Sequence, residues 1–175
     1  MTADGIAPAG PETPRTAFKE WAVICRALAT GRQDVILRKG GIGELGGAFH
    51  PDHAAFLLMP TFLHQSAESL IPAARDLLDG IDADRPPDGQ VVLTHGARVE
   101  AVHRITDAGA LAPFRGRHVW ADVVVMERFH RWRDELHVLE VTVAPLSAAL
   151  VLPWRDSYGG CRSWVELAAD RPTAP

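Results

Sequence analysis

Short strand-like segments with few helices between them make up most of this chain, and that pattern limits the folds open to it. We predict strands at residues 21–25, 34–38, 56–61, 90–105, 119–126 and 136–144. The 90–105 segment alternates most clearly, because Val99, Ala101 and Ile105 fall on one face and charged residues on the other. Parallel strands need crossover helices, and few helices are predicted. The pattern therefore predicts an α+β fold: a strand-rich, curled antiparallel or mixed sheet, or a partial barrel, with two or three flanking helices.

Residues 18–28 allow two interpretations. Phe18, Cys25 and Leu28 fit the apolar stripe of a helix, whereas the apolar run 21–25 suits a buried strand equally well. A turn and then the predicted strand 34–38 follow directly. A hairpin is therefore the more economical interpretation.

Two helices are predicted from their end signals. The clearer one covers residues 66–78, with Ser66 as its cap and Gly80 as its stop. The second is short and near the end of the chain, where residues 163–166 read Ser-Trp-Val-Glu and match a capping box.

Length and composition are those of one globular domain. The chain has 175 residues, of which 47% are hydrophobic. We expect a single domain over 16–169, a disordered tail over 1–15 and a short tail over 170–175. The beginning of the chain does not resemble a signal peptide, and no apolar run approaches the roughly 18 residues of a membrane span. Two cysteines are too few for a disulfide framework, so we expect a cytoplasmic protein without membrane contact.

Charge gives no overall signal for nucleic-acid binding, because the net charge is −4. The 16 arginines against two lysines could reflect a GC-rich genome. Between Arg98 and Arg133, however, seven arginines stand against four acids. A solvated face explains that excess most simply, and a binding surface is the alternative.

Several motifs together resemble a bacterial family known as domain of unknown function eighteen-oh-two. They are Phe18-Lys-Glu-Trp-Ala-Val23, Ile36-Leu-Arg-Lys-Gly-Gly-Ile42 with Glu44, Phe56-Leu-Leu-Met-Pro-Thr-Phe-Leu-His-Gln65, His118-Val-Trp120 and Tyr158-Gly-Gly-Cys-Arg-Ser-Trp164. The resemblance covers about residues 17–167 and implies no activity. At the level of the fold, residues 91–120 are similar to PUA-like barrels, including the ASCH and EVE groups. That likeness implies recognition of RNA or modified bases, and hydrolysis in some members.

The first candidate site is Arg38-Lys39-Gly40-Gly41 with Glu44. Glycines after a strand let backbone N–H groups approach an anion, while the two basic side chains supply charge. A strand end with a flexible loop is the structural alternative.

The second candidate site is Thr61 with His64 and Gln65, at the end of a predicted strand. A histidine and a hydroxyl there could act as a base and a hydrogen-bond donor. The resemblance to ASCH hydrolases implies a lysine, a threonine and a glutamate, and Lys39, Thr61 and Glu44 are the matching types. Our catalytic candidates are therefore Lys39, Glu44, Thr61 and His64, although a capping and loop cluster would explain Thr61, His64 and Gln65 as well.

A metal site is a weaker alternative. His50, His53 and His64 could form one, but neither cysteine is near them, and we predict no metal and no cofactor.

The third candidate site is residues 158–164. Gly159 and Gly160 permit a tight turn, and Tyr158 and Trp164 offer flat faces for a base. Packing of this segment on the core is the structural alternative.

These sites together lead to one functional hypothesis and two alternatives. We predict recognition of RNA, DNA, a nucleotide or a modified base, with hydrolysis as an added possibility. The expected contacts are Arg38, Lys39, Gln65, Arg128, Tyr158 and Trp164. The alternatives are a metal-dependent hydrolase or nuclease that uses His50, His53 and His64, and a non-catalytic module that binds proteins. The oligomeric state stays open.

Overall fold

The computed structural model describes residues 13–39 and 54–168, and within them the chain forms one mixed sheet. Its strands are β1 (Thr16–Trp21), β2 (Val35–Arg38), β3 (Ala55–Thr61), β4 (Gln90–Ile105), β5 (Leu136–Pro153) and β6 (Trp164–Glu166). The order across the sheet is β2-β5-β4-β3-β1-β6. Strands β1 and β3 are parallel and all other neighbours are antiparallel. The predicted α+β fold with a mixed, curled sheet is confirmed.

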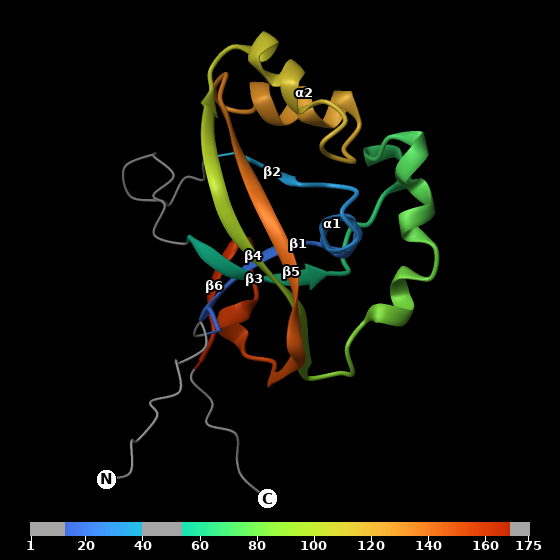
Figure 1. Ribbon diagram of the computed structural model, residues 1–175. Helices are drawn as coiled ribbons and strands as arrows, with labels where there is room; N and C mark the ends of the chain where they lie inside the picture. The colour runs from blue at the N-terminus through green and yellow to red at the C-terminus, as the bar shows by residue number, and fades with distance from the viewer. Residues whose placement is uncertain (1–12, 40–53, 169–175) are drawn as a thin grey trace, which may run out of the picture.

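Helical segments flank the sheet. The α-helices are α1 (Ala22–Ala29) and α2 (Asp122–His130), and the 3-10 segments are η1 (Ala67–Ser69), η2 (Pro72–Leu78), η3 (Ile81–Asp84), η4 (Ala108–Phe114) and η5 (Asp156–Tyr158). Figure 1 shows α1 and the chain from η1 to η3 on one side of the sheet, with α2 near the upper end of β4 and β5. No helix among these residues is long and apolar enough to cross a membrane.

Strands β4 and β5 form a long antiparallel ribbon through the molecule (Figure 1). The pairing shifts register between Leu93 and His95 and again between Val99 and Ala101. Such bulges bend a strand and increase its twist. The ribbon is therefore bent between β2 on one side and β3 on the other, and the sheet curls around the core.

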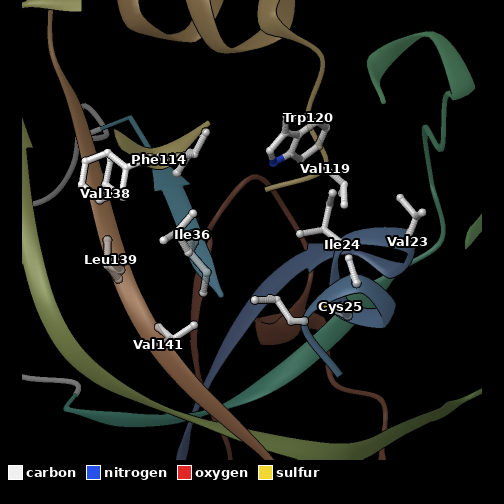
Figure 2. Packing of buried hydrophobic residues seen from close by; sticks show 14 of the residues in the cluster. Val23, Ile24, Cys25, Ile36, Phe114, Val119, Trp120, Val138, Leu139 and Val141 are labelled. Carbon is white, nitrogen blue, oxygen red and sulfur yellow. The ribbon is translucent and has the colours of Figure 1, made fainter. Parts of the chain in front are cut away.

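The main core lies between α1, the inner face of β2 and β5, and the segment before α2. Figure 2 shows buried side chains of one cluster from these elements: Ile24 and Cys25 from α1, Ile36 from β2, Val138, Leu139 and Val141 from β5, and Trp120. Trp120 is almost completely buried and its ring meets that of Trp21 edge-on at 5.0 Å. This packing fixes α1, β2 and the beginning of α2 relative to one another.

The predicted hairpin of 21–25 with 34–38 is wrong. β1 ends at Trp21 and pairs with β3 and β6, and residues 22–29 are the helix α1. Six of the eight residues of α1 are buried, so the helix is apolar almost all round. A short helix of that kind carries the same apolar run as a buried strand, which explains the error.

The strand predicted at 119–126 is also wrong, because residues 122–130 form α2. Only Val125 and Phe129 of this helix are buried, one helical turn apart. The strand-like part is limited to a single bridge between Trp120 and Leu70. The run of three valines therefore lies on a helix whose remaining faces are partly exposed.

Two predicted helices differ as well. The 66–78 segment consists of two 3-10 segments, η1 and η2, instead of one helix. Leu70 lies between them and makes the bridge to Trp120, and Pro72 begins η2. Ser66 makes no capping bond through its side chain. Residues 164–166 are β6, because their backbone groups pair with β1 rather than with each other.

The predicted tails fall mostly outside the described residues. This holds for 1–12 of the first tail and for 170–175. At the inner end of the first tail, the carbonyl of Arg15 accepts a hydrogen bond from the Leu167 N–H at 2.7 Å. Arg15 is therefore joined by its backbone to the residue that follows β6.

Candidate functional site

A cleft of about 900 Å³ lies where the two edges of the sheet approach each other. Arg38 is the last residue of the edge strand β2, and Trp164 is the first residue of the edge strand β6. The Arg38 guanidinium lies 5.2 Å from the Trp164 ring centre and 5.3 Å from that of Phe18. We call this hollow the seam cleft. Its lining is Phe18, Lys19, Glu20, Leu37, Arg38, Lys39, Arg128, Arg131, Trp132, Cys161, Arg162, Ser163 and Trp164.

The seam cleft is strongly cationic. Among the described residues that line it, six side chains are basic and one is acidic, in a chain whose net charge is −4. Within the described ranges, Arg128, Arg131 and Arg162 form no ion pair with a carboxylate. Like charges gathered in this way repel one another, and a bound anion would relieve that repulsion.

Aromatic rings hold several of these arginines. The Arg128 guanidinium lies 3.9 Å from the Trp120 ring centre, and that of Arg131 lies 4.9 Å from Trp132. Burial lowers the pKa of Arg128, and the neighbouring Glu20 carboxyl opposes that shift. A guanidinium stacked on a ring keeps its N–H edge available for a carboxylate or phosphate. The arginines are therefore oriented rather than loosely solvated.

Lys39 fixes one wall of the cleft. Its ammonium group donates to the carbonyls of Phe129 at 2.7 Å and Glu135 at 2.8 Å, and also to that of Arg133. These carbonyls follow the end of α2, where backbone acceptors lack helical partners. Burial lowers the Lys39 pKa. Lys39 thus ties down the turn that carries Arg131 and Trp132.

Lys19 does the same for the opposite wall. Its ammonium group donates to the carbonyls of Tyr158, Gly159 and Gly160 at 2.9, 3.2 and 2.7 Å. Burial lowers its pKa. The connection between β5 and β6, which carries Arg162, is therefore anchored to β1.

Glu20 is the one acidic side chain among the described residues that line the cleft. Its Oε1 accepts a hydrogen bond from the Trp21 N–H at 2.8 Å. Burial raises the pKa of the Glu20 carboxyl, and the charges of Arg128 and Arg38 act in the opposite direction. The carboxyl is thus held in a fixed orientation between cationic groups.

The predicted site residues are divided between different places. Arg38, Lys39, Arg128 and Trp164 line the seam cleft together. Thr61 lines a second, mostly apolar hollow of about 500 Å³, and its hydroxyl donates to the Glu20 carbonyl at 3.2 Å. His64 is exposed, with a φ of 64° in the left-handed region. Glu44 lies outside the described residues.

Gln65 holds the fold at the beginning of α1. Its Oε1 accepts from the Val23 N–H at 3.0 Å, and its Nε2 donates to the Thr61 carbonyl at 2.8 Å. The first N–H groups of a helix lack helical partners, so this side chain acts as a cap from a distant loop.

Tyr158 is completely buried and lies behind the wall that carries Arg162. Its hydroxyl accepts from the Ala168 N–H at 3.1 Å. In this position the Tyr158 ring is not exposed for stacking on a base.

Several residues of the cleft were not among the contacts expected from the sequence, including Glu20, Arg131 and Trp132, and Arg162 lay within the third candidate segment without being singled out. Trp132 is 63% exposed and has a φ of 66°, which is rare for a bulky residue. The run Arg-Trp-Arg at 131–133 was a usable signal, since arginines that flank an aromatic residue suit nucleic-acid contacts.

The described residues contain no group of three histidine, cysteine or acidic side chains that could hold a metal. The histidine site considered above depends on His50 and His53, which lie outside those residues. It therefore gains no support from the geometry.

The fold places the chain in a known structural class. It is similar to two solved structures of variants of an ASCH protein from Zymomonas mobilis. One is a serine-to-alanine variant at 13% identity, with 88% of each chain covered and a TM-score of 0.51. The other is a tyrosine-to-phenylalanine variant at 12% identity, with 88% of this chain and 90% of that chain covered and a TM-score of 0.50. The match to a third ASCH structure from the same organism covers 66% of that structure's chain. Its TM-score of 0.44 is too low to support an argument.

The class is therefore an ASCH-like α+β fold. Within it, the chain belongs to the family described as domain of unknown function DUF1802, whose profile matches residues 17–175. The resemblance inferred from the sequence motifs is confirmed. No curated protein matches the chain.

Proposed function

We propose that the seam cleft binds single-stranded nucleic acid or a nucleotide, with arginines at the phosphates and Trp132 at a base. The observation that carries this proposal is the concentration of six cationic side chains, three of them arginines without an ion pair among the described residues, in one hollow of an acidic chain. Phosphate contacts from arginine supply most of the affinity in such complexes.

Trp132 provides the second element that a nucleotide needs. Its ring is largely exposed at the mouth of the cleft, beside Arg131. Single-stranded nucleic acids bind through charge along the backbone and through bases stacked on aromatic side chains. A residue held in the left-handed region is strained by about 1–3 kcal/mol, and such strain clusters at binding sites.

The volume and rigidity of the cleft suit a ligand of the size of a nucleotide. A volume of about 900 Å³ lies within the usual range for small-molecule and cofactor sites. Both loops that form its walls are tied to strands by Lys19 and Lys39. The cleft is therefore preformed, which reduces the entropy lost on binding.

The proposal concerns binding and does not extend to hydrolysis. Thr61 lines the second hollow rather than the seam cleft, and the Lys39 ammonium group already donates to three carbonyls. These placements do not favour a reaction that needs both side chains at one substrate.

Fluorescence anisotropy with labelled RNA and single-stranded DNA oligonucleotides tests the proposal, at about 50 and about 200 mM salt. The variants are Arg128→Ala with Arg131→Ala, and Trp132→Ala alone. We expect wild-type affinity to fall with salt and Trp132→Ala to lose at least about fivefold, since one base stack contributes about 1–3 kcal/mol. The arginine double variant should lose affinity and depend less on salt.

The matched control is Arg98→Ala with Arg115→Ala, which removes the same charge from exposed positions outside the cleft. It should retain affinity within about twofold if the site is local. Equal losses in the control and the cleft variant, or no binding by the wild type, would refute the proposal. Thermal melts of every variant separate loss of binding from loss of folding.

A further inference from the structure

Glu20 is out of place in a site built for phosphate. It stands among six cationic side chains, where a carboxylate weakens attraction for any polyanion. Burial also raises its pKa, so keeping it ionised is unfavourable for the fold. A group with both disadvantages needs a role that a neutral or cationic side chain could not perform.

The backbone holds Glu20 firmly. Side chains alternate along β1, so Phe18 and Glu20 point to the same face of the strand. Phe18 packs on Trp164 with ring centres 4.9 Å apart, and Arg38 lies over both rings. The Glu20 carbonyl accepts from the Thr61 hydroxyl on the neighbouring strand. Glu20 thus continues the row that begins with the Phe18–Trp164 stack.

The carboxylate retains room for a ligand. An ionised carboxylate has about four acceptor positions, and the Trp21 N–H occupies one of them. That bond also fixes the orientation of the group. An acceptor with two oxygens is therefore presented inside the cleft.

Base chemistry decides which ligand suits this acceptor. On its Watson–Crick edge, guanine carries two adjacent donors, N1–H and the N2 amino group, which match the two oxygens of a carboxylate. Adenine and cytosine each place an acceptor beside their amino group, and uracil places carbonyls on both sides of its single N–H. These acceptors would face the carboxylate and repel it. Single-stranded nucleic acids expose these edges for recognition.

We infer that the seam cleft is selective for guanine, with the Glu20 carboxylate accepting hydrogen bonds from N1–H and the N2 amino group. This inference rests on the proposed nucleotide-binding function of the same cleft. Arg128, whose charge acts on Glu20, is suited to the O6 and N7 acceptors of guanine, the pair that arginine commonly contacts, and this leaves Arg131 and Arg162 for the phosphates. Glu20 and Arg128 together would read donors and acceptors of one base.

Competition of GMP, IMP, AMP, CMP and UMP against a labelled oligonucleotide tests the inference in wild-type protein and in Glu20→Gln. We expect GMP to bind at least about fivefold more tightly than AMP, CMP or UMP, which is the lower end of the discrimination that a good bidentate pair provides. IMP lacks the N2 amino group and should bind between GMP and AMP. In Glu20→Gln, GMP should fall to the level of AMP, while AMP itself should bind as well as before or better.

The result that overturns the inference is equal binding of all nucleotides by the wild type, or a GMP preference that survives in Glu20→Gln. That outcome leaves the proposed function intact, because the nucleotides still bind and the Trp132 and Arg128 variants still lose them. Failure of every nucleotide and oligonucleotide to bind would instead refute the proposed function. Glu20→Asp, which keeps the charge but shortens the side chain, should retain part of the GMP preference and guards against a folding defect in Glu20→Gln.

Discussion

The guanidinium of Arg38 lies 5.2 Å from the ring centre of Trp164, although the two residues belong to opposite edges of the sheet. No pairing between β2 and β6 is present in the described sheet. Side chains rather than a backbone ladder therefore bring the edges together. The seam cleft is the space that remains where a closed barrel would have continuous hydrogen bonds.

The first prediction compares two tryptophans of the cleft. Trp164 packs against Phe18 and Phe56 with ring centres 4.9 and 5.0 Å apart, whereas Trp132 is 63% exposed. We expect Trp164→Ala to lower the free energy of unfolding by about 3 kcal/mol, and Trp132→Ala to change it by less than about 0.5 kcal/mol. Urea denaturation measures both. Similar losses for the two variants would contradict the side-chain closure of the sheet.

The second prediction concerns Lys39. Its removal leaves the carbonyls of Phe129 and Glu135 without this donor at the end of α2. We expect Lys39→Met to lower the free energy of unfolding by about 1–3 kcal/mol, because the methionine keeps the apolar stem but no donor. Arg98→Met, at a side chain that is 68% exposed, serves as the control and should change stability by less than about 0.5 kcal/mol. An unchanged free energy of unfolding in Lys39→Met would show that the hydrogen bonds of the ammonium group contribute nothing to stability.

The third prediction concerns the remote cap of α1. In Gln65→Ala the Val23 N–H loses its acceptor. We expect a loss of about 1 kcal/mol, typical for removal of a helix cap, with nucleotide affinity unchanged. Thermal melting and anisotropy on the same samples check both parts. Lost affinity in a folded Gln65→Ala would restore a direct binding role to Gln65.

The fourth prediction follows from the raised pKa of Glu20. A carboxyl whose pKa is higher in the folded protein than in the unfolded chain destabilises the fold once pH rises above the unfolded value, near 4.3. We therefore expect Glu20→Gln to be more stable than the wild type at neutral pH. The difference should shrink as pH falls and vanish below the unfolded value. A Glu20→Gln protein that is less stable at neutral pH would mean that Glu20 holds the fold through Arg38 and Arg128.

Strands with unambiguous patterns were predictable from the sequence. The bounds of β4 match the predicted 90–105 segment, and β2 and β3 agree with the predicted strands to within a residue. Long alternation and short apolar runs bounded by turn residues determine these elements locally. Their pairing with distant strands does not alter their conformation.

The errors arose where tertiary contacts decide the conformation. α1 is buried on nearly every face, so its composition resembles that of a strand. β6 has three residues and exists because β1 offers a partner at that position. Local signals cannot show either circumstance.

The candidate site was predictable only in part. Arg38, Arg128 and Trp164 were identified from residue type, and the seam cleft brings them together. Glu20 lies within a family motif, but its isolation among cations depends on how the sheet curls. The anchoring roles of Lys19 and Lys39 depend on carbonyls 90 or more residues away, which a spacing argument cannot locate.

The open seam also bears on how copies of the chain meet. Exposed strand edges are templates for aggregation, and short edges that carry positive charge discourage it. Here β2 has four residues and β6 has three, and both open toward the arginines of the seam. An incoming strand would have to approach through those charges. We expect that polyanions, by neutralising them, would remove this protection, so the charges proposed to attract a ligand also keep neighbouring chains apart.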